Sequence, residues 1–98
     1  MTQRAALEER WLTLTRVTLP ALAKKRGWPV YLNHCFQRIL LDNVYSDVWY
    51  HHITKRPAYR YASEIALKQA IALGQKCIDG KADMHLLNKK SLRWRGKG

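Results

Sequence analysis

The sequence contains little cysteine, and this shortage excludes a disulfide-stapled domain. Cys35 and Cys77 are its only two cysteines, and they do not form a Cys-x-x-Cys pair. Small secreted domains that depend on disulfides carry more cysteine than this. Each of the two lies among apolar residues at helical spacing. We therefore interpret both as small buried hydrophobic residues in a reducing compartment.

Long hydrophobic runs are also missing. No stretch of the chain approaches the roughly 18 consecutive apolar residues of a membrane span. Residues 1–26 hold no unbroken apolar run, since Glu8 and Glu9 interrupt them, so we do not expect a secretory signal peptide. The sequence therefore predicts a cytoplasmic protein without a membrane span.

Length and aromatic content indicate one folded domain. The chain has 98 residues, 47% of them hydrophobic, and includes four tryptophans and five tyrosines. A chain of this length forms one domain with a modest core, and large aromatic side chains help to fill that core. We expect a single helical domain over residues 1–98.

The first part of the chain predicts two helices separated by a proline. Thr2 is the expected N-cap of a helix that runs to about Thr18. Pro20 lacks an N–H and is expected to interrupt it. Thr18 would then cap a second short helix that ends at Gly27, where a left-handed conformation is favoured.

The middle of the chain predicts a third helix between less regular segments. Residues 28–30 are expected to be extended because Trp28 precedes a proline. Asn33 is the expected cap of a helix over 34–45. Ser46 is expected to begin a further turn, and residues 55–57 are expected to form a loop.

Two more helices are expected toward the end. Ser63 fits the N-cap of a helix over Glu64–Asp79 that stops at Gly80. A last helix is expected from Ala82 to about Trp94, with the apolar line Met84, Leu87, Ser91 and Trp94 packed in the core. Since every apolar pattern has a helical period, the predicted fold is an all-α bundle of four to six helices.

Acidic residues are few, and this gives the chain a strong positive charge. Eighteen Lys and Arg oppose seven Asp and Glu, for a formal net charge of +11. A field of that sign attracts nucleic acid, an anionic membrane or an acidic protein surface. The basic residues concentrate at the two ends of the chain, and residues 27–54 hold only Arg38. Residues 89–98 form a basic C-terminal segment with five cations and no acid.

Aromatic residues gather between positions 45 and 61. This segment holds half of all the aromatic residues, among Lys55, Arg56 and Arg60. Rings that stack on bases and cations that neutralise phosphates are typical of single-stranded nucleic-acid binding. Trp49 lies four residues before Ile53, a spacing typical of the buried face of a helix, so it is expected to be in the core. Tyr59 and Tyr61 are expected to be exposed.

Motifs for other functions are weak. Residues 19–41 allow a helix-turn-helix with Asn33, His34, Gln37 and Arg38 on its second helix, although Pro29 stiffens the turn. The histidines and cysteines show no paired zinc-ligand spacing, so we expect no metal and no cofactor. An enzyme around His34 and Asp42 is a further alternative, but the sequence contains no phosphate-binding loop or nucleophile elbow.

Three short segments of the sequence resemble segments of known proteins. Residues 26–30 (RGWPV), 34–39 (HCFQRI) and the ending at 87–97 are similar to a group of short, uncharacterised bacterial proteins, some of which are labelled acetyltransferases. An acetyltransferase of the common type needs a mixed sheet and a pyrophosphate-binding loop, and neither pattern occurs here. The resemblance therefore implies a small bacterial helical protein.

The first functional hypothesis is a non-enzymatic accessory protein that binds DNA or RNA mainly through phosphate contacts. The alternative is an interaction module or small subunit that docks on an acidic protein surface, and a homodimer is compatible with either. The residues predicted to contact nucleic acid are cationic or aromatic: Arg56, Tyr59, Arg60, Tyr61, Lys89, Lys90, Arg93 and Arg95.

Overall fold

The computed structural model describes residues 2–97, and within that range all the regular structure is helical. The first helix is one continuous rod made of α1 (Gln3–Thr13), the π-helical turn η1 (Leu14–Thr18) and α2 (Leu19–Arg26). It is followed by α3 (Asn33–Tyr45), the 3-10 turn η2 (Trp49–His51), α4 (Ala58–Tyr61), α5 (Glu64–Ile78) and α6 (Met84–Trp94). The predicted all-α bundle is confirmed.

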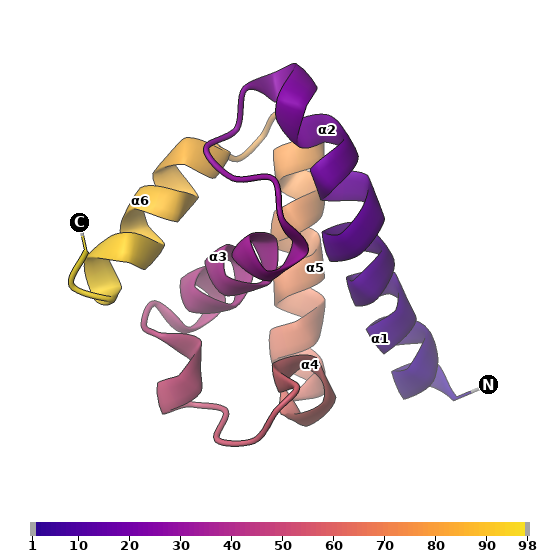
Figure 1. The fold of residues 1–98 in the computed structure, drawn as a ribbon. Helices are drawn as coiled ribbons and strands as arrows, with labels where there is room; N and C mark the ends of the chain where they lie inside the picture. Colours follow the sequence, from indigo (N-terminus) through magenta and orange to yellow (C-terminus); the bar gives the residue numbers. More distant parts are fainter. Residues whose placement is uncertain (1, 98) are drawn as a thin grey trace.

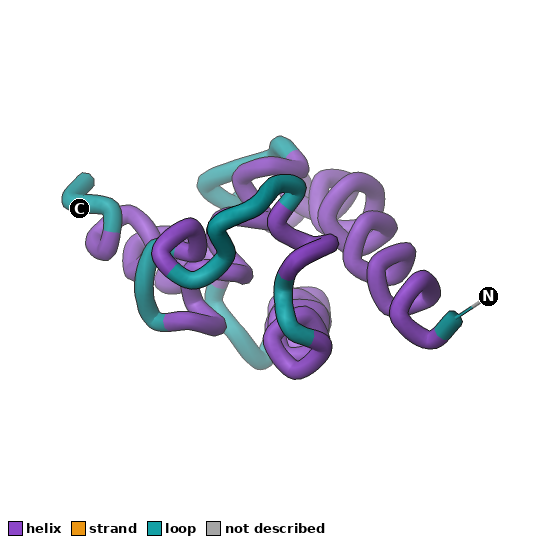
Figure 2. Tube along the Cα trace, turned by 90° about the horizontal axis from the view of Figure 1, so that it is seen from below, coloured by secondary structure: helices purple, strands orange, loops and turns teal. Residues whose placement is uncertain are grey.

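The helices are arranged around α3 and α5. These two helices pack on each other, α1 packs on α5, and α6 packs on α3 (Figure 1). A view from below shows the same order, with α1 and α6 on opposite sides of the molecule (Figure 2). A surface on α6 is therefore separate from any surface on α1.

The rod formed by α1, η1 and α2 begins as predicted but does not break at Pro20. The hydroxyl oxygen of Thr2 accepts a hydrogen bond from the Ala5 N–H at 3.0 Å and caps α1. In η1 the helix widens, so that the Leu19 N–H donates to the Leu14 carbonyl five residues back. We attribute the missing break to this wider turn, which accommodates a residue without an N–H and with a bulky ring. Thr18 is consequently inside the rod and caps nothing.

Two predicted caps of the middle segment are wrong. Leu32 occupies the N-cap position of α3 without a side-chain hydrogen bond, and Asn33 is the first residue of the helix. The further turn is present as η2, but Val48 occupies its N-cap position. Ser46 instead ends α3 in the left-handed conformation, with φ at 52°, and its N–H donates to the Asp42 carbonyl.

The loop expected at residues 55–57 leads into a short helix that the sequence pattern did not indicate. Arg4 of α1 fixes this helix, α4, to the start of the rod. One of its guanidinium nitrogens donates to the carbonyl of Tyr59 at 2.9 Å and to the carbonyl of Ala62 at 2.7 Å. The contact joins positions more than fifty residues apart, so local patterns carried no sign of it.

The helix α5 begins at Glu64 as predicted and ends at Ile78, one residue before the predicted end. The Ser63 hydroxyl accepts a hydrogen bond from the Ala66 N–H at 3.0 Å, and Gly80 follows the helix with φ at 76°. At the middle of α5, Gly74 lets the rod approach closely. A Cβ atom at this position would lie 2.6 Å from a methyl carbon of Leu14.

The core lies where the rod, α3, α5 and the start of α6 meet. Trp11, Phe36, Leu40 and Leu67 are completely buried there. On α6 the predicted apolar line is correct for Met84, Leu87 and Ser91, which are all buried.

The last member of that line, Trp94, is only half-buried and is not part of the packed core, contrary to the prediction. The next inward position of α6 is either three or four residues after Ser91. The structure places Arg95 there, because its guanidinium pairs with a buried carboxylate of α3. Trp94 is consequently turned to the flank of α6.

The two cysteines give a simple test of the packing. Cys77 is buried with 2% of its surface exposed, whereas Cys35 is only half-buried, which corrects the expectation that both are buried. Burial raises the pKa of the Cys77 thiol to about 11, so almost none of it is thiolate at neutral pH.

We expect one cysteine, Cys35, to react with iodoacetamide in the native protein and both to react in denaturant. Mass spectrometry of the labelled peptides measures this. Rapid native labelling of Cys77 would contradict the packing around α5.

Candidate functional site

A buried carboxylate joins α6 to α3. Asp42 of α3 has no exposed surface, and both of its oxygens are hydrogen-bonded. The Ser91 hydroxyl donates to one oxygen at 2.7 Å, and the guanidinium of Arg95 donates to both, at 2.8 and 3.2 Å. The Trp49 backbone N–H donates to the second oxygen at 2.9 Å. Four donors thus satisfy the carboxylate, as a buried charge requires.

Arg38 extends this network along the α3–α6 interface. Its guanidinium donates to the Ser91 hydroxyl at 2.7 Å and to the Asn88 side-chain carbonyl at 2.8 Å. Burial is the main cause that lowers the pKa of Arg38 from its ordinary value, while Asp42 raises it. Arg95 thus binds the carboxylate directly, whereas Arg38 is linked to it through the Ser91 hydroxyl, and these directional contacts set the orientation of α6.

The opposite side of α6 is basic. Lys89, Lys90 and Arg93 are all exposed, and none has an acidic partner within 4 Å among residues 2–97. We call these three residues the outer face of α6. The described part of the chain from residue 84 onward contains no acid, so nothing on the helix itself offsets their charge.

Beside the outer face lies a hollow of about 280 Å³ between α6 and the end of α3. Two of the three cations border it, together with an aromatic ring, an amide and a hydroxyl. We call it the Trp94 hollow, lined by Asn43, Ser46, Lys90, Arg93 and Trp94.

Other predicted residues lie on a different part of the molecule. Arg56 is exposed, and its guanidinium lies 5.2 Å from the centre of the Trp49 ring. Arg60 and Tyr61 are exposed on α4, whereas Tyr59 is half-buried and packs against the core, contrary to the prediction. Arg60 and Tyr61 lie on α4, which is attached to the start of α1, so these two residues do not form one surface with α6 (Figure 1).

Arg95 was predicted to contact phosphate, but its guanidinium forms an ion pair with a buried carboxylate of the protein itself. Only 19% of its side-chain surface is exposed, it is paired with Asp42, and its guanidinium lies 5.4 Å from the centre of the Tyr50 ring. We therefore assign Arg95 to holding α6 in place.

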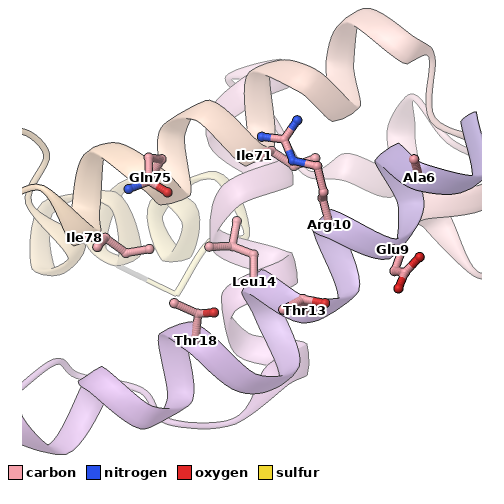
Figure 3. Close-up of a pocket in the computed structure, with 9 residues that line it drawn as sticks. All are labelled: Ala6, Glu9, Arg10, Thr13, Leu14, Thr18, Ile71, Gln75 and Ile78. Carbon is pink, nitrogen blue, oxygen red and sulfur yellow. The ribbon is translucent and has the colours of Figure 1, made fainter. Parts of the chain in front are cut away.

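A second hollow, of about 420 Å³, lies between the rod and α5 (Figure 3). Leu14 points across it toward α5, where Ile71 and Ile78 complete an apolar floor. Its rim carries both Glu9 and Arg10, whose charges are opposite. The charges at this groove therefore offset each other, whereas those of the outer face of α6 are all positive.

The structure does not assemble the alternative sites as the sequence suggested. The helix-turn-helix reading needs Gln37 and Arg38 free, but Gln37 donates to Thr15 and Arg38 to Ser91. His34 is exposed, and no hydrogen bond joins it to Asp42 in the described range. Among residues 2–97, no three His, Cys, Asp or Glu side chains come together to hold a metal ion.

Comparison with known protein families, curated proteins and solved structures found no match. The resemblance to short bacterial proteins therefore stays a prediction. No helix within residues 2–97 is both long enough and apolar enough to cross a membrane.

Sequence reasoning missed the contribution of Trp94, Asn43 and Ser46 to a site. One signal was present in the sequence: Asp42 lies on the apolar side of α3, three residues after Ile39 and one turn before Ser46. An acid in such a stripe must find a donor when the helix is buried. A cation such as Arg95 meets this requirement. Because Arg95 then takes the inward position on α6, Trp94 is not packed in the core.

Proposed function

We propose that this protein is a non-enzymatic nucleic-acid-binding protein whose main contacts run from the outer face of α6 to phosphates. The observation that carries this proposal is the set of exposed cations, Lys89, Lys90 and Arg93, without acidic partners in the described part of the chain. They project from a helix that the Asp42 network holds against α3.

The physical basis is release of counterions from the nucleic acid. Each lysine or arginine that neutralises a phosphate frees condensed counterions, which strengthens binding at low salt. Arg93 adds a planar guanidinium that can donate two hydrogen bonds to one phosphate. A net charge of +11 supports the encounter with a polyanion at long range. Arg56, Arg60 and Tyr61 remain candidates for further contacts.

A second candidate function is docking on an acidic protein surface. Leu86 favours it, because this leucine is 48% exposed on the same helix as the three cations. Specific protein interfaces combine an apolar centre with a polar rim, and an exposed leucine on the same helix as three cations could contribute to both. We place both candidates in the cytoplasm, since the two cysteines of the chain are free thiols.

Neutralising the outer face is expected to abolish most binding to nucleic acid. In the variant with Lys89→Gln, Lys90→Gln and Arg93→Gln, three phosphate contacts are lost. The slope of log affinity against log salt should then become shallower by about 2 for single strands and about 2.7 for duplex. Fluorescence anisotropy with a labelled oligonucleotide over a salt series measures this. The melting temperature should change little, because all three side chains are exposed.

The matched control removes three cations from the rod. Arg10→Gln, Arg16→Gln and Lys25→Gln change the net charge by the same amount at exposed positions away from the outer face. This control should keep the parent's salt dependence nearly unchanged. If both variants lose affinity equally, binding is only a general effect of net charge. If the parent binds no nucleic acid even in dilute buffer, docking on an acidic protein becomes the better proposal.

A further inference from the structure

We infer that the Trp94 hollow receives an unpaired base, so that the protein prefers single-stranded nucleic acid. The inference deepens the proposed function and rests on it. In this hollow an indole ring lies beside two of the three cations of the outer face. Stacking a base on the ring while the cations hold the adjoining phosphates is how single strands are bound without sequence readout.

The position of Trp94 is explained by a ligand better than by packing. The side chain is half-buried and is not among the residues packed against the core, although it is the largest side chain on α6. Arg95 fills the inward position next to it. Trp94 instead lines the hollow together with Lys90 and Arg93, and the part of its ring that borders the hollow is the surface a base would cover.

The polar lining of the hollow fits the edge of a base or a sugar. Both N–H groups of the Asn43 side chain are already used, since they donate to the carbonyls of Ile39 and Leu87 at 2.8 and 2.9 Å. Its side-chain carbonyl oxygen is therefore the group left to accept a hydrogen bond at the hollow. Ser46, three residues after Asn43 at the end of α3, is exposed and adds a hydroxyl group to the lining. One acceptor and one hydroxyl orient a polar ring without demanding a particular base.

The size of the hollow and the need for a free ring face favour a single strand. A volume of about 280 Å³ is small for a ligand pocket and suits one ring system. In a duplex each base is stacked between its neighbours, so its face cannot meet the indole unless the base leaves the helix. A duplex would therefore reach the cations of the outer face but not Trp94.

The test compares Trp94→Ala with the parent on an oligothymidylate and on a duplex of equal length. We expect affinity for the single strand to fall by about 5- to 150-fold, the range for loss of one stacked base. Affinity for the duplex should stay within about twofold, since the phosphate contacts remain. Trp94→Phe keeps a ring and should recover part of the single-strand affinity. Tyr31→Ala, which removes an exposed ring from the segment between α2 and α3, is the matched control and should change neither affinity.

A second measurement does not depend on the alanine variant. Tryptophan emission of the parent should be quenched when the single strand binds, and most of this quenching should disappear in Trp94→Phe. An equal loss for both nucleic acids in Trp94→Ala would show that the ring only supports α6 and would overturn the inference. Unchanged single-strand affinity would overturn it as well, while the charge-dependent binding would stand. A parent that binds neither nucleic acid would overturn the proposed function too.

Discussion

Replacing Asp42 by alanine is expected to lower the free energy of unfolding by about 3–5 kcal/mol. The carboxylate is completely buried and accepts hydrogen bonds from Ser91, Arg95 and the Trp49 backbone. Its removal leaves these donors without their acceptor and leaves Arg95 without its counter-charge. For a domain of about 100 residues, whose total stability is about 5–15 kcal/mol, this is a large share.

The melting temperature reports the loss directly. A change of this size should lower Tm by at least about 12 °C, measured by circular dichroism. Asp42→Asn keeps the shape and one acceptor for the Trp49 N–H, so its loss should be smaller. Asp47→Ala is the matched control, because the Asp47 carboxylate is 39% exposed and its hydrogen bonds, to the Val48 N–H and to the exposed rings of His51 and His52, join residues at most five positions away. If Asp42→Ala melts like the parent, the network does not hold α6 in place.

Replacing either of two tryptophans by alanine should lower the free energy of unfolding by very different amounts. Trp11 is completely buried among the core residues of the rod, α3 and α5, so Trp11→Ala should cost about 3–5 kcal/mol of unfolding free energy. Trp94 is half-buried outside that core, so Trp94→Ala should cost about 1 kcal/mol or less. Urea unfolding of both variants measures the two free energies.

A phenylalanine variant sharpens the comparison. The indole N–H of Trp11 is buried and has no hydrogen-bond partner among the described residues. Trp11→Phe removes this unsatisfied donor while it keeps an aromatic ring, so it should destabilise much less than alanine does. Equal losses for Trp11→Ala and Trp94→Ala would place Trp94 in the core after all and weaken the inference that its ring is free for a base.

The candidate site was only partly predictable. The basic segment that begins at Lys89 is visible in the sequence because charge is a property of composition. The separation of that segment from Arg60 and Tyr61 is not visible, because it depends on how Arg4 attaches α4 to the start of the rod. The hollow beside Trp94 could not be predicted either, since it is bounded by residues from two helices.

The sequence by itself determined the helical class, several helix ends and the positive charge. Thr2, Ser63 and Gly27 act within one turn of their own positions, so local chemistry is enough to place them. Apolar spacing likewise identified the buried side of α6 as far as Ser91. Each of these features depends on neighbours a few residues away.

Only the tertiary structure decided which residue of the last turn of α6 faces inward. Trp94 and Arg95 both fit the helical period after Ser91, and hydrophobicity alone favours the tryptophan. The choice depends on Asp42, which lies 53 residues away from Arg95 and would be a buried charge without a partner. Leaving that carboxylate unpaired costs more than leaving an indole partly exposed, so Arg95 takes the inward position and Trp94 stays on the flank of α6.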